Sequence, residues 1–295
     1  MPITLETQID NLEFRANYSA PLKPADNQAV LFCLPGGGCS AQYFDLHPGY
    51  SFTRKMTDFG HHVITMDHPG TASNKAAIGN NFLTPRKAAE YIYHCLKAFT
   101  ENLDLAHLPL IGIGHSMGGM TTTLIQGLSN PYKAIALFGS SAGGLDWGLT
   151  EEEKYYIDKP DELKRDLESL SLSKFGRAFT EIPAGPSGES ITFGGESEVL
   201  TLALRKTACE LYAAGGMMSM VRGSFTQEVH AIDIPIFFAF GDNDIGIPPI
   251  DVPKAYINAR DTAMLILPDT GHNHFAFKSI SLLCARLNDW IAKVI

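Results

Sequence analysis

The sequence predicts an α/β fold in which a mostly parallel sheet is covered on both faces by helices. Short apolar runs alternate with longer stretches of helical periodicity, and each run stops at a loop rich in Gly, Asp or Ser. Strands that are apolar throughout are typical of parallel sheets, because both of their faces are buried. The 295 residues suffice for one large domain, or for a core domain with an inserted lid.

The apolar runs and the periodic stretches predict the individual elements in order. Strands are expected at residues 29–34, 62–66, 108–113, 134–138, 235–240 and 264–267. A helix is expected after Thr84, because Pro85 follows a capping residue and apolar side chains then recur three or four positions apart. A second helix, at residues 117–128, follows the third strand directly, and a third covers residues 280–294.

Between residues 145 and 228 this rhythm stops. The span contains amphipathic stretches and a methionine-rich patch but no convincing buried strand. We interpret it as a mostly helical cap (lid), inserted into a core domain formed by residues 1–144 and 229–295. A loop rich in Pro, Gly and Ser at residues 183–195 is the part of this cap that we expect to move.

Composition disfavours several classes of partner. The net charge of −9 and the pI near 5.5 argue against nucleic acid, which is bound by clustered Lys and Arg. The five cysteines are scattered without a Cys-x-x-Cys pair, which fits a reducing compartment. The sequence starts without a signal-peptide pattern and has no run of ~18 apolar residues. We expect a cytoplasmic protein that acts on a small molecule and has no membrane span; its oligomeric state is not readable.

Ser116 is the candidate nucleophile. A serine hydroxyl needs a neighbouring base to take its proton and a third group to orient that base. Ser116 lies in the run Gly-His-Ser-Met-Gly, and the small residues Gly114 and Gly118 suit a sharp turn between a strand and a helix. The five-residue pattern alone is weak evidence, but its position between a predicted strand and a predicted helix supports it.

Five segments in this order resemble the α/β-hydrolase superfamily, in particular its lidded, esterase- or lipase-like serine hydrolases. They are Pro-Gly-Gly-Gly at 35–38, Asp-His-Pro-Gly at 67–70, Gly-His-Ser-Met-Gly-Gly at 114–119, Gly-Asp-Asn-Asp at 241–244 and Gly-His at 271–272. The match covers nearly the whole chain outside residues 145–228. The resemblance implies an α/β-hydrolase fold, with a mostly parallel eight-stranded sheet, helices on both faces and an inserted helical lid.

The resemblance also implies a catalytic triad, whose members follow strands in the order nucleophile, acid, histidine. Ser116, Asp244 and His272 match this order. His274 is the alternative base; if it is not the base, we expect it to be a loop residue that bonds nearby backbone or lines the pocket. Asp242 is the alternative acid, and Asp146, the nearest carboxylate after the preceding predicted strand, is a weaker one.

Backbone amides are the expected donors of the oxyanion hole. One is Met117, directly after the nucleophile at a helix N-terminus, and the other is Gly37 or alternatively Gly38. Pro35 departs from the family, in which a histidine often precedes the glycines, so the shape of this loop does not follow from the resemblance. The glycines lack a Gly-Lys-Ser/Thr continuation, which disfavours nucleotide binding, and the pair His272 and His274 lacks further metal ligands. We expect no cofactor and no metal.

The predicted reaction is hydrolysis of a carboxylic ester or lactone through an acyl-enzyme on Ser116. A substrate of modest size with an apolar portion is expected, because the cap is rich in apolar residues. Hydrolysis of a carbon–carbon bond, an aminopeptidase or a thioesterase on the same triad, and a ligand-binding member of the fold without activity remain alternatives. Dehalogenases and epoxide hydrolases of this fold use an aspartate nucleophile, which Ser116 disfavours.

Other conspicuous side chains are interpreted as structural. Several aromatic and methionine residues could line an apolar pocket, although such residues are more often core. They are Tyr43, Phe44, Trp147, Tyr212, Met217, Met218 and Met220. Cys33 and Cys39 flank the glycine loop and are expected to be buried apolar residues rather than reactive thiols.

Overall fold

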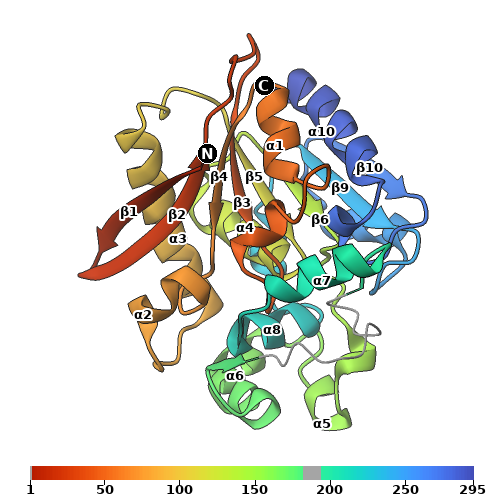
Figure 1. Ribbon diagram of the computed structural model, residues 1–295. Coiled ribbons are helices and arrows are strands. Elements are labelled where there is room, and N and C mark those ends of the chain that lie inside the picture. Colours follow the sequence, from red (N-terminus) through yellow and green to blue (C-terminus); the bar gives the residue numbers. More distant parts are fainter. Residues whose placement is uncertain (1, 182–193) are drawn as a thin grey trace.

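A computed structural model describes residues 2–181 and 194–295 of the chain. Its main feature is an eight-stranded sheet with the strand order β1-β2-β4-β3-β5-β6-β9-β10 (Figure 1). The strands are β1 (Ile3–Ile9), β2 (Leu12–Ser19), β3 (Val30–Leu34), β4 (His62–Met66), β5 (Leu110–His115), β6 (Ala134–Phe138), β9 (Ile236–Gly241) and β10 (Thr262–Leu267). Within this sheet, β1–β2 and β2–β4 pair antiparallel and the other neighbours pair in parallel. The predicted eight-stranded, mostly parallel sheet is therefore confirmed.

All six strands predicted from apolar runs are present, and β4 and β6 have the predicted bounds. The hairpin of β1 and β2 was not assigned from the sequence. Its turn is made by Asp10 and Asn11, which both have positive φ angles, 52° and 64°. Such angles are typical of a two-residue hairpin turn, whose twist matches that of the strands. The alternating apolar residues of β1 were a signal for this strand.

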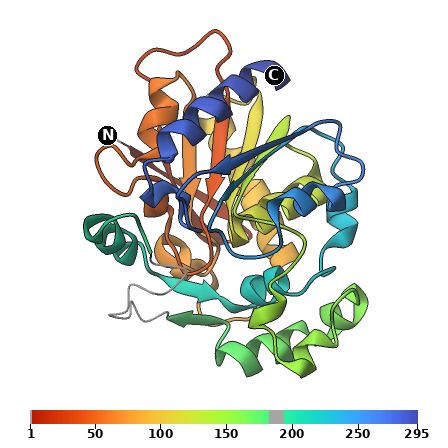
Figure 2. The same ribbon diagram turned by 90° about the vertical axis from the view of Figure 1, so that its right-hand side faces the viewer.

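Helices cover both faces of the sheet, as predicted (Figures 1 and 2). On one face lie α3 (Pro85–Asn102) and α4 (Met117–Ser129), which pack on each other, and on the other lie α1 (Phe52–Asp58) and α10 (Ile280–Val294). The Thr84 hydroxyl accepts a hydrogen bond from the backbone N–H of Lys87 and so caps α3, as its sequence predicts.

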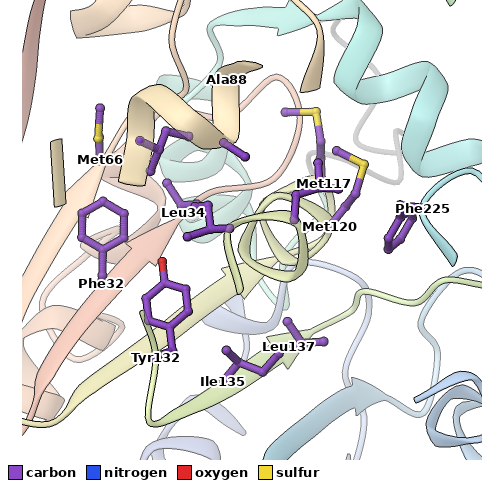
Figure 3. Packing of buried hydrophobic residues seen from close by; sticks show 14 of the residues in the cluster. Phe32, Leu34, Met66, Ala88, Met117, Met120, Tyr132, Ile135, Leu137 and Phe225 are labelled. Carbon is purple, nitrogen blue, oxygen red and sulfur yellow. The ribbon is translucent and has the colours of Figure 1, made fainter. Parts of the chain in front are cut away.

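The alternation of side chains along each strand divides the core into two clusters. Along β3, Val30, Phe32 and Leu34 face the cluster under α3 and α4, whereas Leu31 and Cys33 face the cluster under α1 and α10. Figure 3 shows part of the first cluster, in which side chains from β3 and β6 meet those of α4. Burial on both faces is the reason why these strands read as continuous apolar runs.

Most of the elements between β6 and β9 lie beyond one end of the sheet (Figures 1 and 2), whereas the last of them, α9 (Thr226–His230), packs on α4. They are η3 (Asp146–Gly148), α5 (Glu151–Lys154), α6 (Pro160–Phe175), β7 (Phe179–Glu181), α7 (Glu198–Lys206), β8 (Glu210–Tyr212), α8 (Ala213–Met220) and α9. β7 and β8 pair antiparallel, a small sheet that the sequence did not predict. The loop expected to move, at 183–195, lies outside the described residues except for its last two positions.

The remaining elements are short and join the others. They are η1 (Ala41–Phe44), η2 (Ala72–Asn74), α2 (Lys75–Ile78), η4 (Pro249–Ala255) and η5 (His274–Ala276). Among residues 2–181 and 194–295, no helix has the length and apolar character needed to cross a membrane.

Candidate active site

Ser116 lies at a strained turn between β5 and α4. Its backbone has φ 52° and ψ −122°, a conformation that costs a non-glycine residue on the order of 1–3 kcal/mol. Side chains larger than hydrogen do not fit beside it: a Cβ on Gly114 would lie 2.5 Å from the backbone of Gly119, and one on Gly118 would lie 2.2 Å from the carbonyl oxygen of Leu34. Gly114 and Gly118 therefore allow the backbone to turn and present the Ser116 hydroxyl.

His272 and Asp244 are brought together by the loops after β10 and β9. Nδ1 of His272 lies 2.6 Å from Oδ1 of Asp244, and the two side chains are only 6% and 3% exposed. Backbone N–H groups of Gly241 and Ile245 also donate to the Asp244 carboxylate, at 3.3 and 2.7 Å. These hydrogen bonds orient the carboxylate so that Oδ1 is directed at the imidazole of His272.

The surroundings of Asp244 keep it ionised. Burial alone would raise the pKa of this carboxyl, but hydrogen bonds from His272 and His274 hold its pKa well below the usual value. An ionised carboxylate only accepts hydrogen bonds, so Nδ1 of His272 carries the proton. In serine hydrolases the other ring nitrogen, Nε2, takes the hydroxyl proton. In the neutral His272 ring with its proton on Nδ1, Nε2 can act as this acceptor.

Ser116 and His272 line one cavity of about 40 Å³. Its wall combines serine hydroxyls, glycine backbone and a few apolar side chains. The other lining residues are Met117, Gly139, Ser140, Ser141, Gly144, Leu145, Ser219, Phe240, Ile245 and Gly246. A cavity needs roughly 10–15 Å³ to hold one water molecule, so this one holds only a few.

The glycine loop after β3 packs against the start of α4. A Cβ on Gly36 would lie 3.2 Å from Cβ of Ser116, and a Cβ on Gly37 would lie 3.4 Å from Sδ of Met117. The backbone N–H groups of the first helical turn have no partner within the helix, and the helix dipole favours negative charge there. Met117 is the first residue of α4, so its N–H is available beside this loop.

Three separate contacts hold the glycine loop in place. Nε2 of the buried His68 donates to the carbonyl oxygen of Pro35 at 2.9 Å. From the segment between β6 and β9, the N–H of Cys209 donates to the Gly38 carbonyl at 2.9 Å, and the Thr207 carbonyl accepts from the N–H of Ser40 at 2.7 Å. Although Pro35 replaces the histidine that is common in relatives, His68 supplies a histidine contact to the same loop.

The alternative acids and the alternative base have other partners. Asp242 accepts hydrogen bonds from the N–H groups of Asp269 and Thr270, both at 2.9 Å, so it ties down the loop before His272. Asp146 forms an ion pair of 3.7 Å with Arg222. His274 is fully buried and its Nε2 lies 2.8 Å from Oδ2 of Asp244, the oxygen that His272 does not use.

Two contributions of histidine were missed by the sequence reasoning. His115, next to Ser116, donates from Nε2 to the backbone carbonyl of His272 at 2.8 Å. The role of His274 as a partner of Asp244 was also not foreseen. The sequence offered only weak signals, namely a histidine inside the serine motif and a second histidine two positions after the first.

The side chains interpreted as structural are mostly buried. Tyr43, Phe44, Tyr212, Met217 and Met218 are at most 1% exposed, as expected for core, and none of them lines the cavity beside Ser116 in the described part of the protein. Trp147 is an exception, since it is 64% exposed. Cys33 and Cys39 are buried as predicted, and burial raises the pKa of the Cys39 thiol to about 11.

Within residues 2–181 and 194–295, no group of three or more His, Cys, Asp or Glu side chains is arranged to hold a metal ion. The nucleophilic and ionisable side chains gathered at the candidate site are Ser116, His272, His274 and Asp244.

Comparison with known proteins gives a family and a set of similar folds. Residues 30–279 match the model of a family described as the alpha/beta hydrolase family. No curated protein sequence matches the chain. Three similar solved structures illustrate the range: a thermophilic esterase from Thermogutta terrifontis, the thioesterase domain from the curacin biosynthetic pathway and the N-acyl homoserine lactonase AidH.

These structures cover almost the whole chain at low sequence identity. The esterase has 13% identity and a TM-score of 0.63, and the alignment covers 100% of this chain and 99% of that one. The thioesterase domain has 15% identity and a TM-score of 0.60, with 99% of both chains covered. The lactonase has 16% identity and a TM-score of 0.64, with 100% of this chain and 98% of that one covered. Likeness at this level of identity shows the shared fold.

Proposed function

The chain belongs to the alpha/beta hydrolase family, and from this premise we propose that it is a serine hydrolase that cleaves a carboxylic ester or lactone through an acyl-enzyme on Ser116. One observation carries the proposal: Ser116, on its strained turn, lines the same cavity as His272, whose ring is hydrogen-bonded to the ionised Asp244. Nucleophile, base and orienting acid are the three groups that acyl transfer by serine needs.

The proposed reaction has two steps. In the first, Nε2 of His272 takes the proton of the Ser116 hydroxyl while the oxygen adds to the substrate carbonyl. The tetrahedral intermediate then collapses, and the imidazolium returns the proton to the leaving alkoxide. In the second step, water loses a proton to His272 and attacks the acyl-enzyme, and the carboxylic acid leaves as Ser116 recovers its proton. Asp244 stabilises the imidazolium in both steps.

The negative oxygen of each intermediate is proposed to bind the backbone N–H groups of Met117 and Gly37. The packing of Gly37 on Met117 and the position of Met117 at the start of α4 support this pair. Gly38 is the alternative donor, at the position where the loop turns with a φ of 77°. Donors of this kind typically contribute ~3 kcal/mol each to transition-state stabilisation.

The cavity supports a substrate of modest size. About 40 Å³ beside Ser116 accommodates a short acyl group, and Leu145, Phe240 and Ile245 supply apolar contacts for it. The esterase and lactonase among the similar structures act on the two proposed bond types. Thioester cleavage, named for another similar structure, is the nearest competing activity.

We further propose that residues 145–228 act as a cap over this site. Leu211 and Gly215 contact Gly37 and Met117, and Ser219 lines the cavity, which supports this function. The boundary at residue 228 falls inside α9, which packs on α4. The buried Glu228 of α9 also forms an ion pair with Arg86 of α3. We also propose a cytoplasmic location, with which the five free cysteines are compatible.

Labelling by a fluorophosphonate probe tests the proposal directly. We expect stoichiometric covalent labelling of the wild-type protein and none of Ser116→Ala. His272→Ala should slow labelling by several orders of magnitude. A wild-type protein that stays unlabelled under conditions that label a control esterase contradicts the proposed function.

A substrate panel then separates the bond types. Nitrophenyl esters, lactones, acyl thioesters, aminoacyl amides and diketones of matched acyl length are compared by kcat/KM. The proposal expects the highest values for esters or lactones. A higher value for thioesters, amides or diketones would assign the same triad to one of the alternative reactions.

A further inference from the structure

Asp244 receives hydrogen bonds from two histidines rather than one. Nδ1 of His272 lies 2.6 Å from Oδ1, and Nε2 of His274 lies 2.8 Å from Oδ2. The N–H groups of Ile245 and Gly241 donate to the same two oxygens, one to each. Each oxygen of the carboxylate thus has one histidine and one backbone donor, an arrangement that a triad alone does not require.

The burial of His274 indicates how it is protonated. The residue is fully buried, and its Nδ1 has no hydrogen-bond partner among the described residues. A ring protonated on both nitrogens would leave a charged N–H donor buried without an acceptor, which is costly. The tautomer with the proton on Nε2 leaves only a lone pair unmatched. His274 therefore fits a neutral donor to Asp244.

His274 differs from His272 in what it can reach. His272 lines the cavity together with Ser116, whereas His274 is not among the described residues that line it. Its position on η5 points Nε2 at the far side of Asp244. His274 cannot take the Ser116 proton from there and acts on the reaction only through Asp244.

We propose that His274 is a positioning residue, which holds Oδ2 of Asp244 so that Oδ1 stays directed at His272. This inference deepens the proposed function and rests on it. A carboxylate can rotate about its Cβ–Cγ bond. The backbone donor at Oδ2, the Gly241 N–H, is long at 3.3 Å, so the 2.8 Å bond from His274 is the stronger restraint on this oxygen. Since a misplacement of about 1 Å can cost ~100-fold in rate, holding the acid has a direct kinetic effect.

The hydrogen bond from His274 also changes how the negative charge is distributed over the two oxygens of Asp244. A hydrogen bond to Oδ2 draws negative charge away from Oδ1 and weakens the stabilisation of the His272 imidazolium. Around His272, Asp244 bonds to Nδ1, the His115 ring lies 4.8 Å away between centroids, and Ser116 lines the same cavity. The His115 ring also lies 5.6 Å from that of His274 on η5. Tyr43 on η1 packs on His115 with ring centroids 4.6 Å apart. Asp244 is the charged group of this set, so a change in hydrogen bonding at its Oδ2 alters the stabilisation of the His272 imidazolium.

Two variants of His274 separate positioning from simple structural support. His274→Leu removes the donor at similar volume, and His274→Gln keeps an N–H at nearly the position of Nε2. For His274→Leu we expect fluorophosphonate labelling at pH 7 to slow by about 10–100-fold, with the acid limb of its pH–rate profile moved to higher pH. For His274→Gln we expect a rate within about 3-fold of the wild type and an unmoved acid limb.

Proton NMR gives a readout that does not depend on activity. The Nδ1–H proton of His272, identified by its loss in His272→Ala, should resonate far downfield in the wild type and in His274→Gln. In His274→Leu it should shift or broaden. Thermal unfolding of all three proteins shows whether they are folded.

The outcomes distinguish this inference from the proposed function. If the wild type is labelled but His274→Leu reacts at the same rate with the same acid limb and an unchanged downfield signal, the positioning role is wrong and the serine hydrolase stands. If the wild type is not labelled but the downfield signal responds to His274→Leu and not to His274→Gln, the positioning role stands and the function is wrong. A His274→Gln protein as impaired as His274→Leu also overturns the role.

Discussion

The backbone carbonyl oxygen of His272 lies 2.8 Å from Nε2 of His115, the residue directly before Ser116. A carbonyl only accepts, so His115 carries its proton on Nε2, and burial lowers the pKa of His115 well below its usual value and keeps it neutral. The loop that carries the proposed base is thereby tied to the strand that carries the proposed nucleophile.

This tie predicts the effect of replacing His115. His115→Phe leaves the His272 carbonyl buried without a donor, which should cost about 1–3 kcal/mol of unfolding free energy and slow fluorophosphonate labelling by about 10-fold. His115→Gln, which retains a donor, should lose less of both. Equal losses in the two variants would indicate that the ring, rather than the hydrogen bond, matters.

Replacing Asp244 should reduce turnover far more than binding. In Asp244→Asn the amide favours the wrong tautomer of His272, so kcat should fall by about 10⁴-fold with little change in KM. Asp242→Asn is the matched control, because Asp242 bonds to the backbone of Asp269 and Thr270. Steady-state kinetics of both variants on the best ester of the panel make the comparison, and a control as slow as Asp244→Asn would shift the acid to Asp242.

Stability should fall as the pH drops below about 6.5. Burial lowers the pKa of His61, His62, His68 and His115, so these rings stay neutral in the folded protein. Below pH 6.5 the unfolded chain binds more protons than the folded one, and each such histidine removes up to about 1.4 kcal/mol per pH unit until its lowered pKa is reached. Urea unfolding at pH 7.5, 6.0 and 5.0 measures this slope.

A variant at His68 checks the origin of that slope. His68→Gln keeps a donor for the Pro35 carbonyl but does not titrate, so its stability should depend less steeply on pH below 6.5. A slope identical to that of the wild type would assign the pH dependence to other groups.

The turn at Ser116 should not tolerate a methyl group. In Gly118→Ala the new Cβ would lie 2.2 Å from the Leu34 carbonyl, and we expect a loss of about 2 kcal/mol or more. Gly216→Ala is the control within a helix, since its Cβ would meet Phe175 at an ordinary 3.4 Å. Alanine is the better helix former there, so this variant should be neutral or more stable. Thermal unfolding distinguishes the two.

The size of the cavity predicts a preference for short acyl groups. Nitrophenyl acetate or butyrate should be hydrolysed with a kcat/KM at least about 10-fold above that of the octanoate, because about 40 Å³ does not hold a long chain. Leu145→Ala enlarges the cavity and should shift the preference to longer chains. Val199→Ala, at an exposed position outside the lining, should not. Equal rates on all lengths would contradict this account of the pocket.

The parts of the fold that could be predicted are those in which one local pattern decides the structure. β4 is apolar at every position except His62 and Thr65, and Ile280 begins a helical stripe, so burial and periodicity define these elements. β7 and β8 could not be predicted, because each has three residues and exists through its pairing with the other.

The candidate site could likewise be predicted only where neighbouring residues decide the structure. The strand-to-helix turn at Ser116 could be predicted from its neighbours in the chain. The bond from His274 to Asp244 depends on the turn at η5, which places two nearby histidines at opposite oxygens of one carboxylate. No sequence spacing encodes this geometry, because the partners lie 28 and 30 residues away. The same holds for His115, whose partner is 157 residues away.

The insertion between β6 and β9 has a consequence for evolution. These two strands are neighbours in the sheet and pair in parallel register, so nearly a hundred residues of chain leave and return at adjacent strands. We therefore expect changes of length in this segment to leave the pairing of β6 with β9 intact. On the proposed function, changes at Leu145 and Ser219, which line the cavity, would alter what is recognised, whereas Thr207 and Cys209 are constrained by their hydrogen bonds to the glycine loop.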